Sequence, residues 1–180
     1  MKTKIEITSV SGQLLFEYEK ENNTVKDTLL EAIERDVDLC DADLKGIDLR
    51  DADLRETDLY GANLCDAILC GTNLRCANLF SATLYNADLR NASLRSADLH
   101  NADLRDADLR DANLRDTDLC NADLSGANLG SVNLRSADIR DADLCNTILC
   151  HADLRGANLR GANLRNADLR DSVLSSTNLS

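Results

Sequence analysis

Residues 87–116 read ADLRN ASLRS ADLHN ADLRD ADLRD ANLRD, six five-residue units with leucine at the third position of each. The spacing continues in both directions without a slip. From residue 39 to residue 179 there are 29 consecutive third positions, and every one is leucine except Ile139. The first position is alanine in 20 of these units, and the second is Asp or Asn in 24. This regularity makes the five-residue unit the feature that decides the fold.

A period of five residues fits neither an ordinary helix nor a flat strand. On an α-helix, steps of five residues turn by about 140°, so the leucines would spread around the whole cylinder. On a strand, odd spacing would send successive leucines to opposite faces. The chain must therefore turn in the same sense after each unit, which keeps the leucine and the small first residue inside. Repetition at one fixed period predicts a solenoid.

The unit A(D/N)LRx, as in Ala52–Arg55 and Ala107–Arg110, resembles the pentapeptide-repeat family. The resemblance covers residues 37–180 without interruption. It implies an all-β solenoid, a right-handed quadrilateral β-helix of about seven coils, with one unit on each side and twenty residues in each coil. It also implies that the leucine and the first residue of each unit point inward while the other three residues point outward.

A longer period supports the coil of twenty residues independently. The segment LCDAILC at residues 64–70 returns as LCNTILC at residues 144–150, eighty positions later. Other residues repeat at the same distance: Cys40 with Cys120, Cys65 with Cys145, Ile68 with Ile148 and Cys70 with Cys150. Eighty is a multiple of twenty but not of fifteen. An internal duplication that kept each residue on its side therefore indicates coils of four units.

Residues 1–36 lack the repeat and form a separate N-terminal region before the β-helix of residues 37–180. Alternating residues predict strands at 2–8 and 14–18, joined as a β-hairpin. Thr24 followed by Asp27 is a capping-box arrangement that begins a helix. The apolar stripe of this helix is predicted to run through Val25, Leu29, Ile33 and Val37. Because an open solenoid end exposes its core, we expect hairpin and helix to cover it.

The formal net charge is −12, and it is distributed unevenly when the units are assigned to sides by twenty-residue coils. Three sides have net charges of −5, −3 and −3, whereas the fourth has +2. That fourth side carries an arginine after the leucine in six successive coils, which we call the arginine column: Arg55, Arg75, Arg95, Arg115, Arg135 and Arg155. The column suits an anion or an acidic partner. Alternatively, each arginine pairs with a neighbouring carboxylate and merely keeps the rod soluble.

The aromatic residues are few and form a pattern of their own. Tyr60, Phe80 and His100 fall on one side in successive coils, and Tyr85 lies one corner on from Phe80. Exposed aromatic side chains of this kind could form a partner-binding patch. Equally, they could stack along the β-helix and cover the backbone ladder without any further role.

The sequence predicts no enzyme, catalytic centre, cofactor or metal site. Cysteines that share a side are four coils apart, roughly 19 Å at strand spacing, whereas a structural zinc site needs four convergent ligands. His100 and His151 fall on different sides. We therefore expect seven free surface thiols in a reducing cytoplasm. No stretch approaches a membrane span, and the first residues lack the apolar core of a signal peptide.

Two classes of function fit these observations. The first is a non-enzymatic protein-binding or scaffold rod that presents its flat sides to an unknown partner. The second follows from the resemblance, since some pentapeptide-repeat proteins mimic duplex DNA, occupy the DNA site of the type II topoisomerase DNA gyrase and confer fluoroquinolone resistance. The acidity fits mimicry, but the arginine column would repel a DNA-binding groove. We expect no direct binding of nucleic acid, and rank the binding rod first.

The C-terminal end is expected to form a homodimer interface. The repeats continue to the last residue, so the last coil ends bare, with four leucines at its end: Leu164, Leu169, Leu174 and Leu179. The resemblance implies that such rods dimerise end to end through their C-terminal coils, and two-fold stacking would cover both ends. A monomer is the alternative, because Ser172, Ser175, Ser176 and Thr177 make this end more polar.

Overall fold

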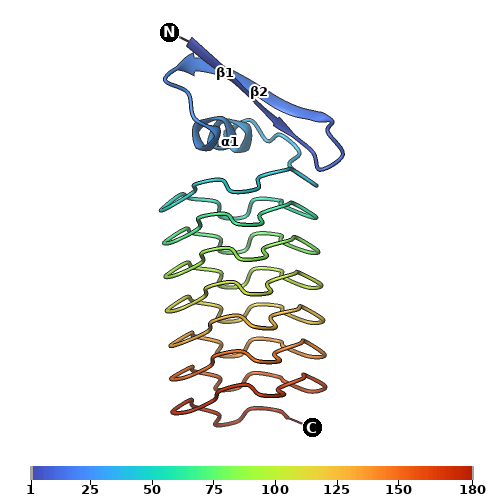
Figure 1. Cartoon of the computed structure of the whole chain (residues 1–180), viewed down its shortest axis with the longest axis vertical. Helices are drawn as coiled ribbons and strands as arrows, with labels where there is room; N and C mark the ends of the chain where they lie inside the picture. The colour runs from blue at the N-terminus through green and yellow to red at the C-terminus, as the bar shows by residue number, and fades with distance from the viewer. Residues whose placement is uncertain (1, 180) are drawn as a thin grey trace.

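The computed structural model describes residues 2–179, which form a stack of coils closed at one end by a small cap (Figure 1). The cap comprises β1 (Lys2–Thr8), β2 (Leu14–Glu21) and α1 (Val25–Glu34). β1 and β2 pair as an antiparallel hairpin with an irregularity between Ile7 and Thr8. In Figure 1 α1 lies between the hairpin and the first coil, so the repeat begins directly beneath the helix.

Each coil takes twenty residues. Isolated parallel bridges join residues twenty apart, beginning with Asp43 to Asn63 and ending with Asn158 to Asn178. One bridge falls in each five-residue unit, at the residue before the leucine. The bridges thus show the twenty-residue period that the internal duplication predicted.

The repeat satisfies its backbone hydrogen-bond donors in a regular way, as in the unit around Leu109. The N–H groups of Leu109 and Asp111 donate to carbonyls nineteen residues later, at 2.7 and 3.0 Å, and that of Asp108 donates to Ala87 at 2.9 Å. The N–H of Ala112 closes a turn onto the Leu109 carbonyl at 3.1 Å. The fifth donor, Arg110 N–H, is accepted by the Asp108 side chain at 3.2 Å. The second position therefore favours Asp or Asn because its Oδ1 caps this last donor.

The corners explain the composition of the fifth position. In each unit from Asp41 to Ser176 the fifth residue has a positive φ, between 56° and 76°. This left-handed conformation is disfavoured for most L-residues, and glycine, Asn and Asp adopt it most readily. Gly, Asn, Asp and Ser accordingly fill most of these corners, whereas Glu56, Cys76 and His151 are exceptions.

The core is a column of leucines and small residues enclosed by the coils. Third-position residues from Leu39 to Leu159 are at most 3% exposed, and Ala42 to Ala157 at the first position are similarly buried. Exposure rises at the C-terminal end, where Leu174 is 39% and Leu179 60% exposed. The inward direction predicted for the first and third positions is therefore correct through the stack.

The cap is joined to the first coil by both hydrogen bonds and packing. Val10 N–H donates to the Asp41 carbonyl, and Asp43 N–H donates to the Thr8 carbonyl, each at 2.7 Å. Leu29 of α1 is fully buried and belongs to the same apolar cluster as the repeat leucines, together with Ile7 and Ala32. The apolar core thus continues from the repeat into the cap.

The cap departs from the sequence prediction in two details. β2 extends to Glu21, three residues beyond the predicted strand, because the hairpin register pairs Lys2 with Glu21. The predicted apolar stripe of α1 is only partly correct, since Val25 is 45% exposed and the helix ends before Val37. The capping box of Thr24 and Asp27 is present as predicted. Within residues 2–179 no helix is long and apolar enough to cross a membrane.

Candidate functional site

The arginine column follows the third-position leucine on one side of six successive coils. Neighbouring coils are held in register there by backbone hydrogen bonds, such as Cys76 N–H to the Arg95 carbonyl at 3.1 Å and Ser96 N–H to the Arg115 carbonyl at 3.0 Å. The side chains of the column are largely exposed. The fold thus places six guanidinium groups along one line parallel to the rod axis.

The residue before the leucine decides whether an arginine is neutralised. When it is Asp, the following arginine forms a bidentate ion pair with it, as Arg55 does with Asp53 and Arg155 with Asp153. In the four units between them the residue before the leucine is neutral: Asn73, Ser93, Asn113 and Asn133. The ends of the column are therefore paired within their own units, and its middle is not.

The four arginines of that middle are called here the central arginines: Arg75, Arg95, Arg115 and Arg135. Two of them approach the same carboxylate, since Asp116 Oδ2 lies 3.5 Å from Arg95 Nε and 3.3 Å from Arg115 Nε. Among residues 2–179, no carboxylate lies within 4.0 Å of the guanidinium nitrogens of Arg75 or Arg135. The four units of the central arginines thus contain four positive side chains and one carboxylate, Asp116.

Tyr60, Phe80 and His100 form a continuous aromatic stack on the side that follows the arginine column along the chain. The ring centroids of Tyr60 and Phe80 are 5.5 Å apart, and those of Phe80 and His100 are 5.2 Å apart. The planes differ by only 6° and 7°, so the rings are nearly parallel. The structure thus places the three rings in contact in adjacent coils, which is compatible with both a partner-binding patch and a simple cover of the backbone ladder.

Tyr85 lies outside this stack. Its ring contacts Arg105 of the next coil, whose guanidinium carbon is 5.6 Å from the ring centroid. This is a cation–π distance, and such contacts stabilise exposed sites by about 0.5–1 kcal/mol. Tyr85 is thus engaged by a residue of its own side, and the structure does not bring it together with the aromatic stack.

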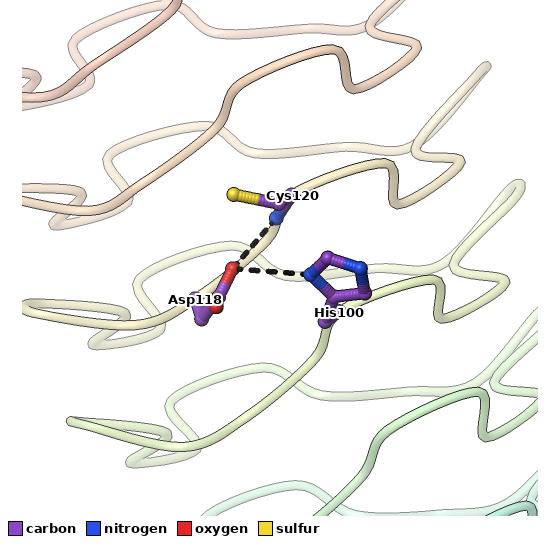
Figure 2. A group of neighbouring side chains, drawn as sticks. All are labelled: His100, Asp118 and Cys120. Atoms are coloured by element: carbon purple, nitrogen blue, oxygen red, sulfur yellow. Dashed lines mark hydrogen bonds and ion pairs between the residues drawn. The ribbon is translucent and has the colours of Figure 1, made fainter.

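The aromatic stack ends beside a mixed cluster of His100, Asp118 and Cys120, shown in Figure 2. The imidazole, carboxylate and thiol each offer a metal-binding atom, and these atoms lie within 4.8 Å of one another. Asp118 Oδ1 accepts the Cys120 backbone N–H at 2.9 Å and lies 3.9 Å from His100 Nδ1. Burial and the nearby carboxylates of Asp118 and Asp138 raise the pKa of the Cys120 thiol to about 12.

The cysteines are free but not all are at the surface, which corrects the sequence expectation. Cys120 and Cys145 are each only 5% exposed, and Cys76 is the one thiol classed as exposed among residues 2–179. Arginines of the next coil reach over the two buried thiols: Arg140 Nη2 lies 3.4 Å from Cys120 Sγ and Arg165 Nη2 lies 3.5 Å from Cys145 Sγ. Long side chains one coil away provide this cover.

A surface hollow lies between the cap and the first coils. Its lining combines cations and carboxylates, including Lys26, Lys45, Asp48 and Arg50. Arg50 forms a bidentate pair with Asp48, Lys26 Nζ donates to the Arg50 carbonyl, and Lys45 Nζ lies 3.8 Å from Asp66 Oδ2. The pair with Arg50 lowers the pKa of Asp48 to about 2.

Comparison with known proteins agrees with this architecture. The family model described as pentapeptide repeats matches eight copies over residues 35–71, 72–111, 112–149 and 152–180. The chain belongs to the pentapeptide-repeat family. Members of this family form right-handed β-helices, in agreement with the stacked coils of Figure 1.

Solved structures of the family are similar to this chain to different degrees. HetL, involved in heterocyst differentiation regulation in the cyanobacterium Nostoc sp. strain PCC 7120, is 38% identical over 75% of this chain and 67% of HetL, with a TM-score of 0.34. A trypsin-treated variant of QnrB1, a plasmid-mediated fluoroquinolone resistance protein, is 20% identical over 76% of this chain and 84% of QnrB1, with a TM-score of 0.55. No curated protein matches the chain.

Sequence reasoning overlooked the cluster of His100, Asp118 and Cys120. Its signal was present, because His100 and Cys120 are twenty residues apart and therefore lie on the same side in adjacent coils. Cysteine pairs and histidine pairs, the usual signals of a metal site, do not include this mixed set, whose members are brought together by spacings of eighteen and twenty residues.

Proposed function

We propose that this protein is a non-enzymatic binding rod whose central arginines dock an acidic helix of a protein partner in the cytoplasm. The observation that carries the proposal is the run of neutral residues before the leucine in the four central units. Their asparagines and serine leave the guanidinium groups without a bidentate partner at the residue before the leucine, and Arg95 and Arg115 share the single carboxylate of Asp116. The arginines at both ends of the column are each held by a carboxylate of their own unit.

The spacing of the central arginines suits a helical partner. Adjacent coils are separated by roughly 4.8 Å, so the four guanidinium groups span roughly 14 Å. Acidic residues three or four apart on a helix have Cβ atoms about 5–6 Å apart, close to the coil spacing. Arginine also binds carboxylates in a planar bidentate geometry, which adds directional preference to charge attraction.

The aromatic stack extends this surface around one corner. We take the cross-section to be four-sided, with one unit on each side and about seven coils. Tyr60, Phe80 and His100 then lie on the side adjoining the arginine column, each five residues after an arginine. A helix docked along the corner would contact guanidinium groups on one flank and ring edges on the other. Aromatic and arginine side chains are the residue types enriched at binding hot spots.

The proposal is tested by fluorescence polarisation with a labelled, helix-forming glutamate-rich peptide as the probe. Replacing both Arg95 and Arg115 with glutamine should weaken binding at least tenfold, with a reduced dependence on salt. The matched control replaces Arg90 and Arg110 with glutamine, since these arginines lie in the same coils on another side and are held by Asp88 and Asp108. Equal weakening by the two double variants, or no binding by the unaltered protein, would overturn the proposal.

The C-terminal coil is proposed to form a symmetric homodimer. Leu174 and Leu179 are 39% and 60% exposed, whereas the equivalent leucines of central coils are fully buried. Stacking two such ends about a two-fold axis would bury both and close the assembly. The dimer would also bring two arginine columns into one rod, which doubles the number of partner helices that can be bound.

Inhibition of a type II topoisomerase by DNA mimicry is the second candidate. It is favoured by the acidic side on which Asp98, Asp118 and Asp138 occupy equivalent positions in successive coils, joined through backbone β-bridges. The similarity to QnrB1 supports the shared fold alone. A supercoiling assay with purified DNA gyrase tests the candidate: protection or inhibition at stoichiometric protein supports it, and unchanged supercoiling excludes it.

A further inference from the structure

Two coils bring three potential metal ligands of different chemistry to one point on the rod. His100 comes from one coil, whereas Asp118 and Cys120 come from the next and flank the same leucine. Figure 2 shows the imidazole Nδ1 directed toward the Asp118 carboxylate, with the Cys120 side chain above it. Among residues 2–179 this is the one group of three such side chains whose ligand atoms lie within 4.8 Å of one another.

Each of the three side chains contacts a neighbour that limits its rotation. The His100 ring stacks on Phe80 with an interplanar angle of 7°, which restrains its plane. Asp118 is oriented by accepting the Cys120 N–H. Cys120 is 5% exposed and lies under the Arg140 guanidinium, which is itself bound to Asp138. Metal ligands oriented by such surrounding contacts bind more tightly than mobile ones.

We propose that His100 Nδ1, one carboxylate oxygen of Asp118 and Cys120 Sγ bind a divalent cation of the zinc class. Nitrogen, oxygen and sulfur are all zinc ligands, at about 2.0–2.3 Å. Tetrahedral geometry at these bond lengths requires ligand atoms roughly 3.3–3.8 Å apart, so rotation of the side chains closes the remaining distance. Three protein ligands leave the fourth position to water, as in zinc sites that are open to solvent.

The charge balance favours a divalent ion. Binding releases the thiol proton to solvent, so that the sulfur binds as thiolate and the imidazole as its neutral form. One thiolate and one carboxylate then offset the two positive charges of the metal. The nearest cation, Arg140, is bound to Asp138, whose carboxylate offsets its charge beside the site. This inference revises the sequence-based expectation that the protein has no metal site.

The internal duplication provides a matched half-site within the same chain. Eighty residues before Cys120, Cys40 N–H donates to Asp38 Oδ1 at 3.0 Å, as Cys120 N–H does to Asp118 at 2.9 Å. The position twenty residues before Cys40 is Lys20 of β2, so the half-site has no histidine. Cys40 therefore shares the thiol and carboxylate but lacks the third ligand, which makes it the control for thiol binding alone.

The experiment is zinc titration of the reduced full-length protein in competition with a chromophoric chelator, accompanied by cobalt(II) absorption spectra. We expect one tight equivalent of zinc and a sulfur-to-cobalt charge-transfer band. His100→Phe, Asp118→Asn and Cys120→Ser should each weaken this equivalent at least about 100-fold, since even supporting residues change affinity by about 10- to 100-fold. Cys40→Ser should leave it unchanged.

The three replacements preserve the fold because each residue type already occupies the same position elsewhere in the repeat. Phenylalanine occurs at position 80, asparagine at position 78 and serine at position 125. Failure of the unaltered protein to bind zinc overturns the proposal. So does retention of full affinity by His100→Phe, or loss of the charge-transfer band in Cys40→Ser rather than in Cys120→Ser.

Discussion

Replacing Leu109 with alanine tests the central claim that stacked leucines hold the rod together. Leu109 is fully buried, and its neighbours at the same position one coil away, Leu89 and Leu129, are also fully buried. The coils are fixed by backbone hydrogen bonds above and below, such as Leu109 N–H to the Asn128 carbonyl. They therefore collapse little around the lost side chain. Such a cavity lowers the free energy of unfolding by about 3–5 kcal/mol.

The same replacement at Leu174 is the matched control. This leucine has the same place in its unit but is 39% exposed in the last coil, so less apolar surface is lost and no closed cavity forms. We expect Leu174→Ala to lower the free energy of unfolding by about 1 kcal/mol. Urea unfolding followed by far-ultraviolet circular dichroism measures both. Equal losses for the two variants would refute the reasoning that enclosed leucine columns, rather than the backbone ladder alone, stabilise the rod.

Four further outcomes follow from the structure. Asp108→Ala loses both the cap on the Arg110 N–H and the ion pair with the Arg110 side chain, and it should lower the free energy of unfolding by about 1–2 kcal/mol in urea unfolding. Asp108→Asn keeps the cap and loses only the exposed ion pair, so its loss should be smaller, about 0–1 kcal/mol. His151→Asn should raise the free energy of unfolding by about 0.5–1 kcal/mol, because asparagine adopts the left-handed corner conformation more readily than histidine. An unchanged urea midpoint contradicts this expectation. Arg50 lowers the folded-state pKa of Asp48 to about 2, so the ion pair stabilises the folded state fully above about pH 4 and loses this effect as the pH falls toward 2. Urea midpoints that do not decline between pH 4 and pH 2 contradict the pairing. Light scattering after size exclusion should give twice 19.7 kDa, and a mass of 19.7 kDa at micromolar concentration excludes the dimer.

The inside and outside of this protein follow from its sequence because the governing constraint is local. Each unit turns once, so a leucine at every third position and a small residue at every first position point inward without knowledge of any distant contact. The capping box of Thr24 and Asp27 is likewise a contact between residues three apart, and it was predicted correctly. The buried face of α1 was predicted less well, since the burial of Val25 depends on which residues pack against the helix.

The candidate sites depend on contacts between neighbouring coils. The residues that meet in them are eighteen to twenty positions apart in the sequence. The arginine column could be aligned from sequence once the coil length was inferred. Which arginines are neutralised became clear only when the structure showed the bidentate pairing of Arg55 with Asp53 and its absence where asparagine or serine precedes the leucine. The cover over Cys120 and Cys145 likewise comes from arginines one coil away.

The repeat, its inward face and the charge of each side can be read from the order of residues along the chain. The meeting of His100, Asp118 and Cys120 and the parallel rings of Tyr60 and Phe80 are seen only in the folded coils. Coil stacking sets the separation of neighbouring backbones, whereas side-chain rotation determines which atoms face one another across that separation. The sequence period therefore specifies the backbone separation, whereas packing determines the side-chain rotations.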